Sequence, residues 1–325
     1  MKSLVTVAMA AAAVAPGTHA LRILQASEES WADLTVRNLH AKLTAANHSA
    51  VLVGPTKHCT RSGRTDRDPE PLMEACQFSS CPAGANATSG RNETDPTLQW
   101  LNAHPKTCMR VGLESMGPMT PGWDGREAQF AVAGPSGAMS RTVNAMPLAL
   151  FAKWTATARA AAWAAFTGVP AIAFASAQDG QSFAWNDTSA PAYTRIYPEL
   201  AARLVEEIVA AGPPYLPEGV FLNVNFPPLT DKCDHPDKFK WVMTHRPSGW
   251  NFWGPRVVNC GKKTRLPDDG IGIRRPEKCY ISVTAVDSWY METHPAPLVH
   301  YNLLKKLEHL WYCTPTANLT CVIGC

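Results

Sequence analysis

The stretch that decides the fold is Leu21 to Pro55, LRILQASEESWADLTVRNLHAKLTAANHSAVLVGP. It begins with a short apolar segment, Leu21–Leu24, which predicts a strand, and a polar turn follows at Gln25–Ser30. The next apolar residues recur with helical spacing, at Leu34, Val36, Leu39 and Leu43. A second apolar segment, His48–Val53, ends at Gly54-Pro55. A strand, a turn, a helix and a second strand in this order are typical of a parallel sheet covered by helices.

Segments of the same kinds continue along the chain and predict an α/β fold. We expect strands at Phe130–Gly134, Val169–Ala175, Val220–Phe226 and Cys279–Ala285, and helices at Leu148–Phe166, Tyr197–Ala210 and Leu298–Leu310. Between them, Thr60–Pro105 is polar and rich in Pro, Gly and Cys, which predicts a long irregular excursion. Ligands of parallel sheets bind outside the carboxyl ends of the strands, so chemistry is expected at Gln25–Ser30 and Pro55–Asp66.

Composition excludes several classes of protein. The chain has 325 residues, with 30 Lys+Arg against 27 Asp+Glu and a formal charge of +3. Hydrophobic residues make up 46% and charged residues 18%, which argues against intrinsic disorder and against a strongly basic nucleic-acid binder. We therefore expect no nucleic-acid partner, and the length suits one large α/β domain or two modest ones.

The N-terminus predicts secretion. Lys2, the apolar run Leu4–Val14 and the small residue Ala20 form a signal peptide at residues 1–20, and the run is too short to span a bilayer. The chain also contains glycosylation sequons at Asn47, Asn86, Asn92, Asn186 and Asn318. The protein is therefore expected to be extracellular and glycosylated, without a membrane anchor.

The ten cysteines favour disulfides over zinc, because no paired histidines accompany their close spacings. We expect one group to clamp the excursion: Cys59, Cys76, Cys81 and Cys108. The others lie later in the chain, at Cys233, Cys260, Cys279, Cys313, Cys321 and Cys325. Their pairing does not follow from the spacing.

Several segments together resemble the SurE family of metal-dependent nucleotidases and phosphatases, specifically its secreted fungal acid-phosphatase-like branch. They are Leu21–Leu24, Trp31-Ala32, Cys76–Gly84 (CQFSSCPAG), Gly168–Phe174 (GVPAIAF), Leu216–Pro228 (LPEGVFLNVNFPP) and Cys279–Val283. The resemblance implies a three-layer Rossmann-like fold with a mostly parallel sheet and an extended C-terminal arm. It also implies a domain at 21–312, followed by a cysteine-containing tail at 313–325, and a homo-oligomer.

The resemblance also implies a site. The family's Asn-Asp-Asp-Gly turn reads Ser27-Glu28-Glu29-Ser30 here, which implies Glu28 and Glu29 as catalytic residues and metal ligands. The other implied metal ligands are Ser62, or Thr60 without a gap, and Ser136. The implied substrate-binding residues are Arg141, Thr157 and Arg159. The implied cofactor is Mg²⁺, Mn²⁺ or Ca²⁺, and the implied substrates are phosphate monoesters, including nucleoside monophosphates.

Departures from the family pattern predict that this activity is lost or altered. A glutamate in place of an aspartate moves the carboxylate by about 1.5 Å, and Ser136 offers a short hydroxyl where the family has an amide oxygen. Such changes disturb the octahedral oxygen shell that Mg²⁺ requires. The protein is therefore either an altered phosphatase or a non-catalytic secreted binding protein that needs no cofactor.

Simpler interpretations remain open for each candidate. Glu28 and Glu29 are also typical of carboxylates in the first turn of a helix, where the helix dipole favours negative charge. Ser27 is typical of a helix N-cap. Arg141 and Arg159 fit surface salt bridges. His58 fits either a loop histidine without a nearby partner or a general acid.

Overall fold

The computed structural model describes residues 20–59, 66–84, 87–137, 154–177, 181–247 and 254–314. The signal peptide expected at 1–20 therefore lies outside the described residues except for Ala20. Ser62, its alternative Thr60, and Arg141 also lie outside them, as do Cys321 and Cys325.

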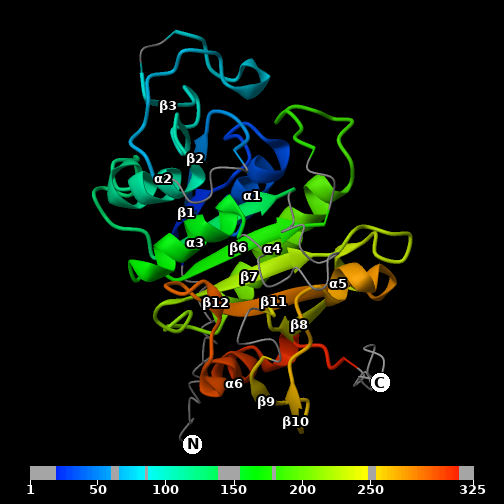
Figure 1. The fold of residues 1–325 in the computed structure, drawn as a ribbon. Helices are drawn as coiled ribbons and strands as arrows, with labels where there is room; N and C mark the ends of the chain where they lie inside the picture. The colour runs from blue at the N-terminus through cyan, green and yellow to red at the C-terminus, as the bar shows by residue number, and fades with distance from the viewer. Residues whose placement is uncertain are drawn as a thin grey trace, which may run out of the picture.

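One large, mostly parallel sheet forms the centre of the described chain (Figure 1). Its strand order is β12-β11-β7-β6-β5-β1-β2-β4-β3, and β8 also pairs with β11. The parallel strands that run from one side of the sheet to the other are β7 (Val220–Phe226), β6 (Ala171–Ser176), β5 (Phe130–Ser136), β1 (Arg22–Ala26), β2 (Ser49–Pro55) and β4 (Leu98–Leu101). The strands at the margins are β3 (Ser89–Arg91), β8 (Lys240–Thr244), β11 (Tyr280–Asp287) and β12 (Glu292–Thr293). Of these, β11 pairs antiparallel with β7, and β8 pairs parallel with β11.

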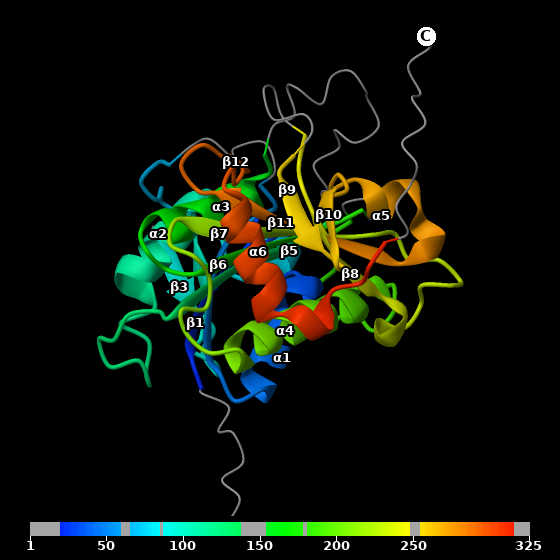
Figure 2. The same ribbon diagram turned by 90° about the horizontal axis from the view of Figure 1, so that it is seen from below.

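Helices cover both faces of the sheet, which gives three layers (Figure 2). Two lie on one face, α1 (Leu34–Ala45) and α4 (Tyr193–Ala210), and two on the other, α2 (Pro105–Val111) and α3 (Ala156–Phe166). Because side chains alternate along a strand, Ile23 of β1 packs into the core with α1 and α4, whereas Leu24 packs into the core with α2 and α3. The expected three-layer α/β fold is confirmed.

The C-terminal part of the described chain adds strands and helices of its own around the β11 and β8 side of the sheet in Figure 1. They are β9 (Arg256–Asn259), β10 (Lys262–Arg265), α5 (Ile271–Arg274) and α6 (Pro297–Lys306). The remaining short turns are η1 (Gln77–Ser79), η2 (Gly112–Met116, π-helical), η5 (Pro236–Lys238), η7 (Pro276–Lys278) and η8 (Glu308–Leu310). Disulfides Cys233–Cys279 and Cys260–Cys313 tie this region together.

Three expectations from the sequence need correction. Of the helix expected at Leu148–Phe166, residues 148–153 lie outside the described residues, and α3 begins at Ala156, because the Thr155 side chain accepts the Ala158 N–H and caps it. The excursion expected to be irregular contains β3 and β4, which extend the sheet. Of the four cysteines expected to clamp it, Cys76 and Cys81 form a disulfide, whereas Cys59 and Cys108 are thiols.

None of the helices in the described ranges has both the length and the apolar character needed to cross a lipid bilayer.

Candidate functional site

The turn with the two glutamates lies at the carboxyl end of β1, between β1 and α1. It is held tightly over β2: the Trp31 N–H donates to Pro55 O at 2.9 Å, and a Cβ on Gly54 would lie 2.8 Å from Trp31 Cα. Only glycine therefore fits at position 54 without a shift of the turn. Within the turn, Ser27 Oγ accepts the Glu29 N–H at 3.0 Å. Ser27 is thus not the N-cap of α1.

Asp33 caps α1 instead, a role that the sequence analysis missed. Its Oδ1 accepts the N–H groups of Thr35 at 2.8 Å and Val36 at 3.2 Å, and its Oδ2 accepts the Phe183 N–H at 3.2 Å. Burial, and then the charge of Glu29, raise the pKa of Asp33 to about 7. An Asp just before the first helical residue was the available signal.

Glu28 is completely buried, and both of its carboxylate oxygens accept hydrogen bonds. Oε1 accepts from the Ser136 hydroxyl, and Oε2 accepts the Thr157 N–H at 3.3 Å. Burial raises the pKa of Glu28 to about 7, although the bond from Ser136 opposes the shift. Glu28 therefore lies between β5 and the N-terminus of α3.

A bulge in β5 brings Ser136 to this place. The pairing of β5 with β6 shifts between Ala133 and Ser136, and Gly134 has φ +102. A Cβ on Gly134 would lie 2.3 Å from Phe174 O, so the close approach of β5 to β6 requires glycine. Bulges of this kind re-aim side chains next to sites.

Glu29 is also buried and has three partners. Its Oε1 accepts the Gly137 N–H at 3.1 Å, and its Oε2 contacts His58 Nδ1 at 2.5 Å and the Ser182 hydroxyl at 2.9 Å. The hydrogen bond with Glu29 is the main cause that raises the pKa of His58. His58 does lie in a loop, and it has a partner that the sequence did not identify, because Glu29 lies on another loop that the fold brings beside it.

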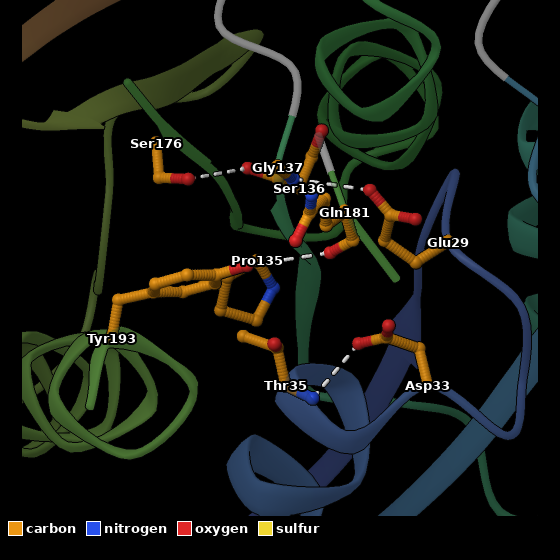
Figure 3. Close-up of a pocket in the computed structure, with 9 residues that line it drawn as sticks. All are labelled: Glu29, Asp33, Thr35, Pro135, Ser136, Gly137, Ser176, Gln181 and Tyr193. Carbon is orange, nitrogen blue, oxygen red and sulfur yellow. Dashed lines mark hydrogen bonds between the residues drawn. The ribbon is translucent and has the colours of Figure 1, made fainter. Parts of the chain in front are cut away.

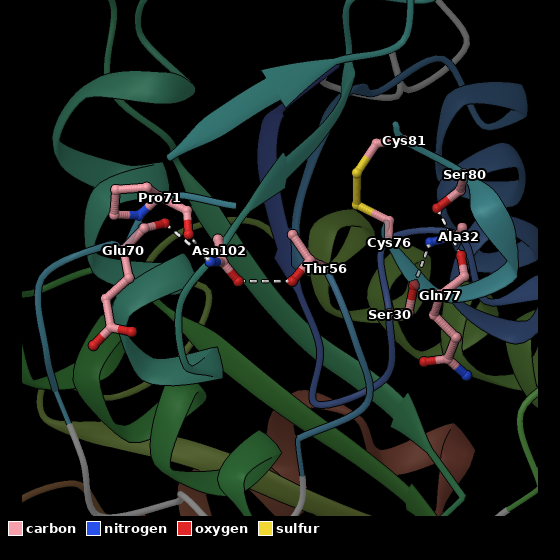
Figure 4. The surroundings of a disulfide bond; sticks show 10 residues. All are labelled: Ser30, Ala32, Thr56, Glu70, Pro71, Cys76, Gln77, Ser80, Cys81 and Asn102. Atoms are coloured by element: carbon pink, nitrogen blue, oxygen red, sulfur yellow. Dashed lines mark hydrogen bonds between the residues drawn. A yellow bond between two sulfur atoms is a disulfide. The ribbon is translucent and has the colours of Figure 1, made fainter. Parts of the chain in front are cut away.

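A disulfide also supports the loop that carries His58, and Figure 4 shows this disulfide beside Gln77. Cys76–Cys81 closes a tight turn, from which the Gln77 N–H donates to Thr56 O at 2.9 Å. The Gln77 side chain then accepts the His58 N–H at 2.8 Å. The turn of the CQFSSCPAG motif thus positions a residue that contacts Glu29.

A small polar cavity of about 10 Å³ lies beside Glu29, large enough for about one water molecule (Figure 3). It is lined by Glu29, Asp33, Thr35, Pro135, Ser136, Gly137, Ser176, Gln181 and Tyr193. The cavity marks the point where the loops after β1, β5 and β6 meet.

Thr157 and Arg159 lie in the first turn of α3. Thr157 is buried, and its hydroxyl oxygen has no hydrogen-bond partner among the described residues. Arg159 is half-buried. The structure therefore brings Glu28, Glu29, Ser136 and Thr157 together, as expected from the sequence, and adds His58 and Asp33.

The residues as arranged do not fit a divalent cation. A cation needs carboxylate oxygens that face a common point, whereas those of Glu28 and Glu29 face hydroxyl, imidazole and N–H groups. Within the described part of the chain, no group of three or more His, Cys, Asp or Glu side chains is placed to hold a metal ion. Ligation by Glu28, Glu29, Ser62 and Ser136 stays a prediction.

Comparisons with known proteins agree with the fold. The family model described as "Survival protein SurE" matches residues 23–248. An acid phosphatase of Yarrowia lipolytica is 25% identical over 238 residues, which cover 66% of this chain and 60% of that protein. The crystal structure of the SurE protein from Aquifex aeolicus matches 89% of this chain and 99% of that chain, with a TM-score of 0.53 and 15% identity.

Proposed function

The chain belongs to the SurE family, and from that premise we propose that it is a secreted protein in which the family's metal-dependent hydrolysis of phosphate monoesters is lost or altered. The family is typically dependent on divalent metals. The observation that carries the proposal is the pair Glu28 and Glu29, whose four oxygens all accept hydrogen bonds from the protein itself.

The altered chemistry that the site supports best is acid–base chemistry by His58. Glu29 orients the His58 ring through Nδ1, which leaves Nε2 for a proton exchanged with a ligand. The His58 side chain is 30% exposed, so it is accessible where Glu28 and Glu29 are not. An imidazolium here would supply positive charge next to a bound phosphate group, which the family obtains from its metal.

A second candidate is a binding protein without catalysis. The Glu28 carboxylate accepts the Thr157 N–H at the N-terminus of α3, where a phosphate oxygen would otherwise be favoured. A protein side chain in this position competes with a phosphate ester and supports the non-catalytic alternative.

Secretion forms part of the proposal, with a signal peptide at 1–20, a SurE-like domain at 21–312 and a tail at 313–325. Three disulfides between described residues support it, since disulfides persist in oxidising compartments. The sequon residues Asn47 and Asn186 are exposed, as glycosylation requires. We also propose a homo-oligomer, on the family resemblance alone.

The test is an activity and binding assay on the mature protein. Hydrolysis of p-nitrophenyl phosphate and nucleoside monophosphates is measured with Mg²⁺, Mn²⁺, Ca²⁺ or a chelator. We expect no turnover that depends on metal. Turnover in the chelator that falls by about a hundredfold in His58→Gln would establish the altered activity. Binding of nucleotides by calorimetry without turnover would establish the binding protein.

The decisive comparison is between the double variant Glu28→Ala/Glu29→Ala and the control Glu218→Ala, which changes an exposed glutamate. Metal-stimulated turnover that only the double variant loses would show that the ancestral activity persists and would refute the proposal. The absence of both turnover and binding would refute phosphate monoesters as ligands.

A further inference from the structure

Two cysteines outside the disulfides of the described chain, Cys59 and Cys108, flank the same histidine. Cys59 Sγ lies 3.3 Å from His104 Nδ1. Cys108 lies one helical turn after His104 in α2, and its N–H donates to His104 O at 2.8 Å. The first turn of α2 thus carries Cys108, and the N-cap residue of the same helix, His104, contacts Cys59.

The two thiols have different environments. Cys108 is completely buried, and its Sγ is 3.8 Å from Ala103 O. Burial raises the pKa of the Cys108 thiol, and the nearby Cys59 raises it further. Cys59 is half-buried and can be reached from solvent. Cys59 is therefore the thiol that can react first with an external reagent.

His104 provides a base for Cys59. Burial, and then the charge of Arg67, lower the pKa of His104, which favours the neutral form of its ring. A neutral ring with its hydrogen on Nε2 accepts the thiol hydrogen at Nδ1. The 3.3 Å contact is consistent with this transfer.

Cys59 is also attached to the candidate site. Its N–H donates to Glu28 O at 2.8 Å, and it directly follows His58, which pairs with Glu29. A covalent bond at Cys59 would therefore restrain the loop that carries His58.

We propose that Cys59 and Cys108 are a reactive thiol pair that closes into a disulfide by exchange with a small-molecule disulfide such as oxidised glutathione, and that this bond ties the His58 loop to α2. First, Cys59 loses its proton to His104 and attacks one sulfur of the reagent, which gives a mixed disulfide and one glutathione thiol. Cys108 then loses its proton and attacks Cys59 Sγ, which releases the second glutathione thiol. Two protein thiols are oxidised, one disulfide is reduced, and both protons end on the glutathiones.

The test is peptide mapping of the full-length secreted protein, alkylated in denaturant and digested without reduction. We expect a peptide pair linked through Cys59 and Cys108, either as isolated or after treatment with oxidised glutathione. Alkylation of both residues after that treatment, or a bridge from either to Cys321 or Cys325, would overturn the proposal.

Two variants separate the steps. In Cys108→Ala the reaction stops, so Cys59 keeps one glutathione as a stable adduct. In Cys59→Ser, Cys108 stays unmodified in the folded protein, because it is buried. Modification of Cys108 at the wild-type rate in that variant would contradict the proposed order. His104→Gln is expected to slow the first adduct by roughly tenfold. None of these readouts depends on enzymatic activity, so their failure would leave the proposed function untouched.

Discussion

Gln77 accepts the backbone N–H of His58 at 2.8 Å, although 19 residues separate the two in sequence. Gln77 belongs to the turn that the Cys76–Cys81 disulfide closes, and His58 contacts Glu29 through its ring. A buried disulfide of the excursion is therefore coupled to a buried carboxylate through two hydrogen bonds. This coupling gives a structural reason for the CQFSSCPAG motif beside the site.

The double variant Cys76→Ser/Cys81→Ser should release the loop that carries His58 and should lower the stability of the fold only modestly. Its short loop predicts a loss of about 2 kcal/mol in the free energy of unfolding, measured in urea. Because Gln77 no longer holds the His58 loop, the NMR titration midpoint of His58 should move toward its ordinary value.

The matched control is Cys233→Ser/Cys279→Ser, whose sequence separation is 46 residues instead of 5. Its longer loop predicts a larger loss, of about 4 kcal/mol. It should leave the His58 titration unchanged, since it lies in the C-terminal region. Equal shifts of His58 in both variants would contradict the coupling through Gln77.

Glu28→Gln should stabilise the protein at alkaline pH and change little at acid pH. The pKa of Glu28 rises from 4.5 to about 7 on folding. The folded chain therefore holds the proton over a wider pH range, so stability falls as pH rises from 4.5 to 7 and levels off above that. The lost stability is on the order of 3 kcal/mol. A glutamine removes the charge and can still bond with Ser136 and Thr157.

Urea denaturation at pH 4.5, 6 and 8 checks this prediction. The gain of Glu28→Gln over the wild type should be near zero at pH 4.5 and largest at pH 8. Glu218→Gln, the same exchange at an exposed position, should parallel the wild type at all three values. A gain independent of pH would mean that the buried charge is not its cause.

Glu29→Gln should lower the titration midpoint of His58. The hydrogen bond with Glu29 is the largest cause that raises the pKa of His58. A raised histidine pKa contributes stability that is complete below about 6.5 and is lost as pH rises through the folded pKa. The variant should therefore lose stability mainly at acid pH. The control is Glu74→Gln, which removes an exposed partner of Lys57 and should leave His58 unchanged.

The sequence was sufficient for the elements whose signal is local. Val220–Phe226 is bounded by Gly219 and Pro227, and the structure has β7 over the same residues. The strand β4 was missed because its four residues are a short apolar segment among sequons and prolines. It becomes a strand by pairing with β2 and β3. Pairing with neighbouring strands therefore determines β4, whereas the local β propensity of its residues does not.

The candidate site was predictable only in part for a similar reason. The resemblance located Glu28, Glu29, Ser136 and Thr157, which converge in the structure. It assigned no role to His58, because the contact with Glu29 joins residues 29 positions apart on different loops. A contact between two loops leaves no periodic pattern in the sequence, so the contact of His58 with Glu29 is seen only in the fold.

The cap of α1 gives a final prediction that separates hydrogen bonding from charge. Asp33→Ala removes the acceptor for the Thr35 and Val36 N–H groups and should cost about 1–2 kcal/mol at pH 5. Asp33→Asn keeps an oxygen for these two groups but places an amide against the Phe183 N–H, so it should cost less than alanine.

The pH dependence distinguishes the two contributions. Because the pKa of Asp33 rises from 3.8 to about 7 on folding, stability falls as pH rises from 3.8 to 7 and levels off above that value. Asp33→Asn should therefore approach or exceed the wild type at pH 8, whereas Thr155→Ala, which removes the cap of α3, should cost about 1 kcal/mol at either pH. Equal losses for Asp33→Asn and Asp33→Ala at pH 5 would show that the cap does not stabilise α1.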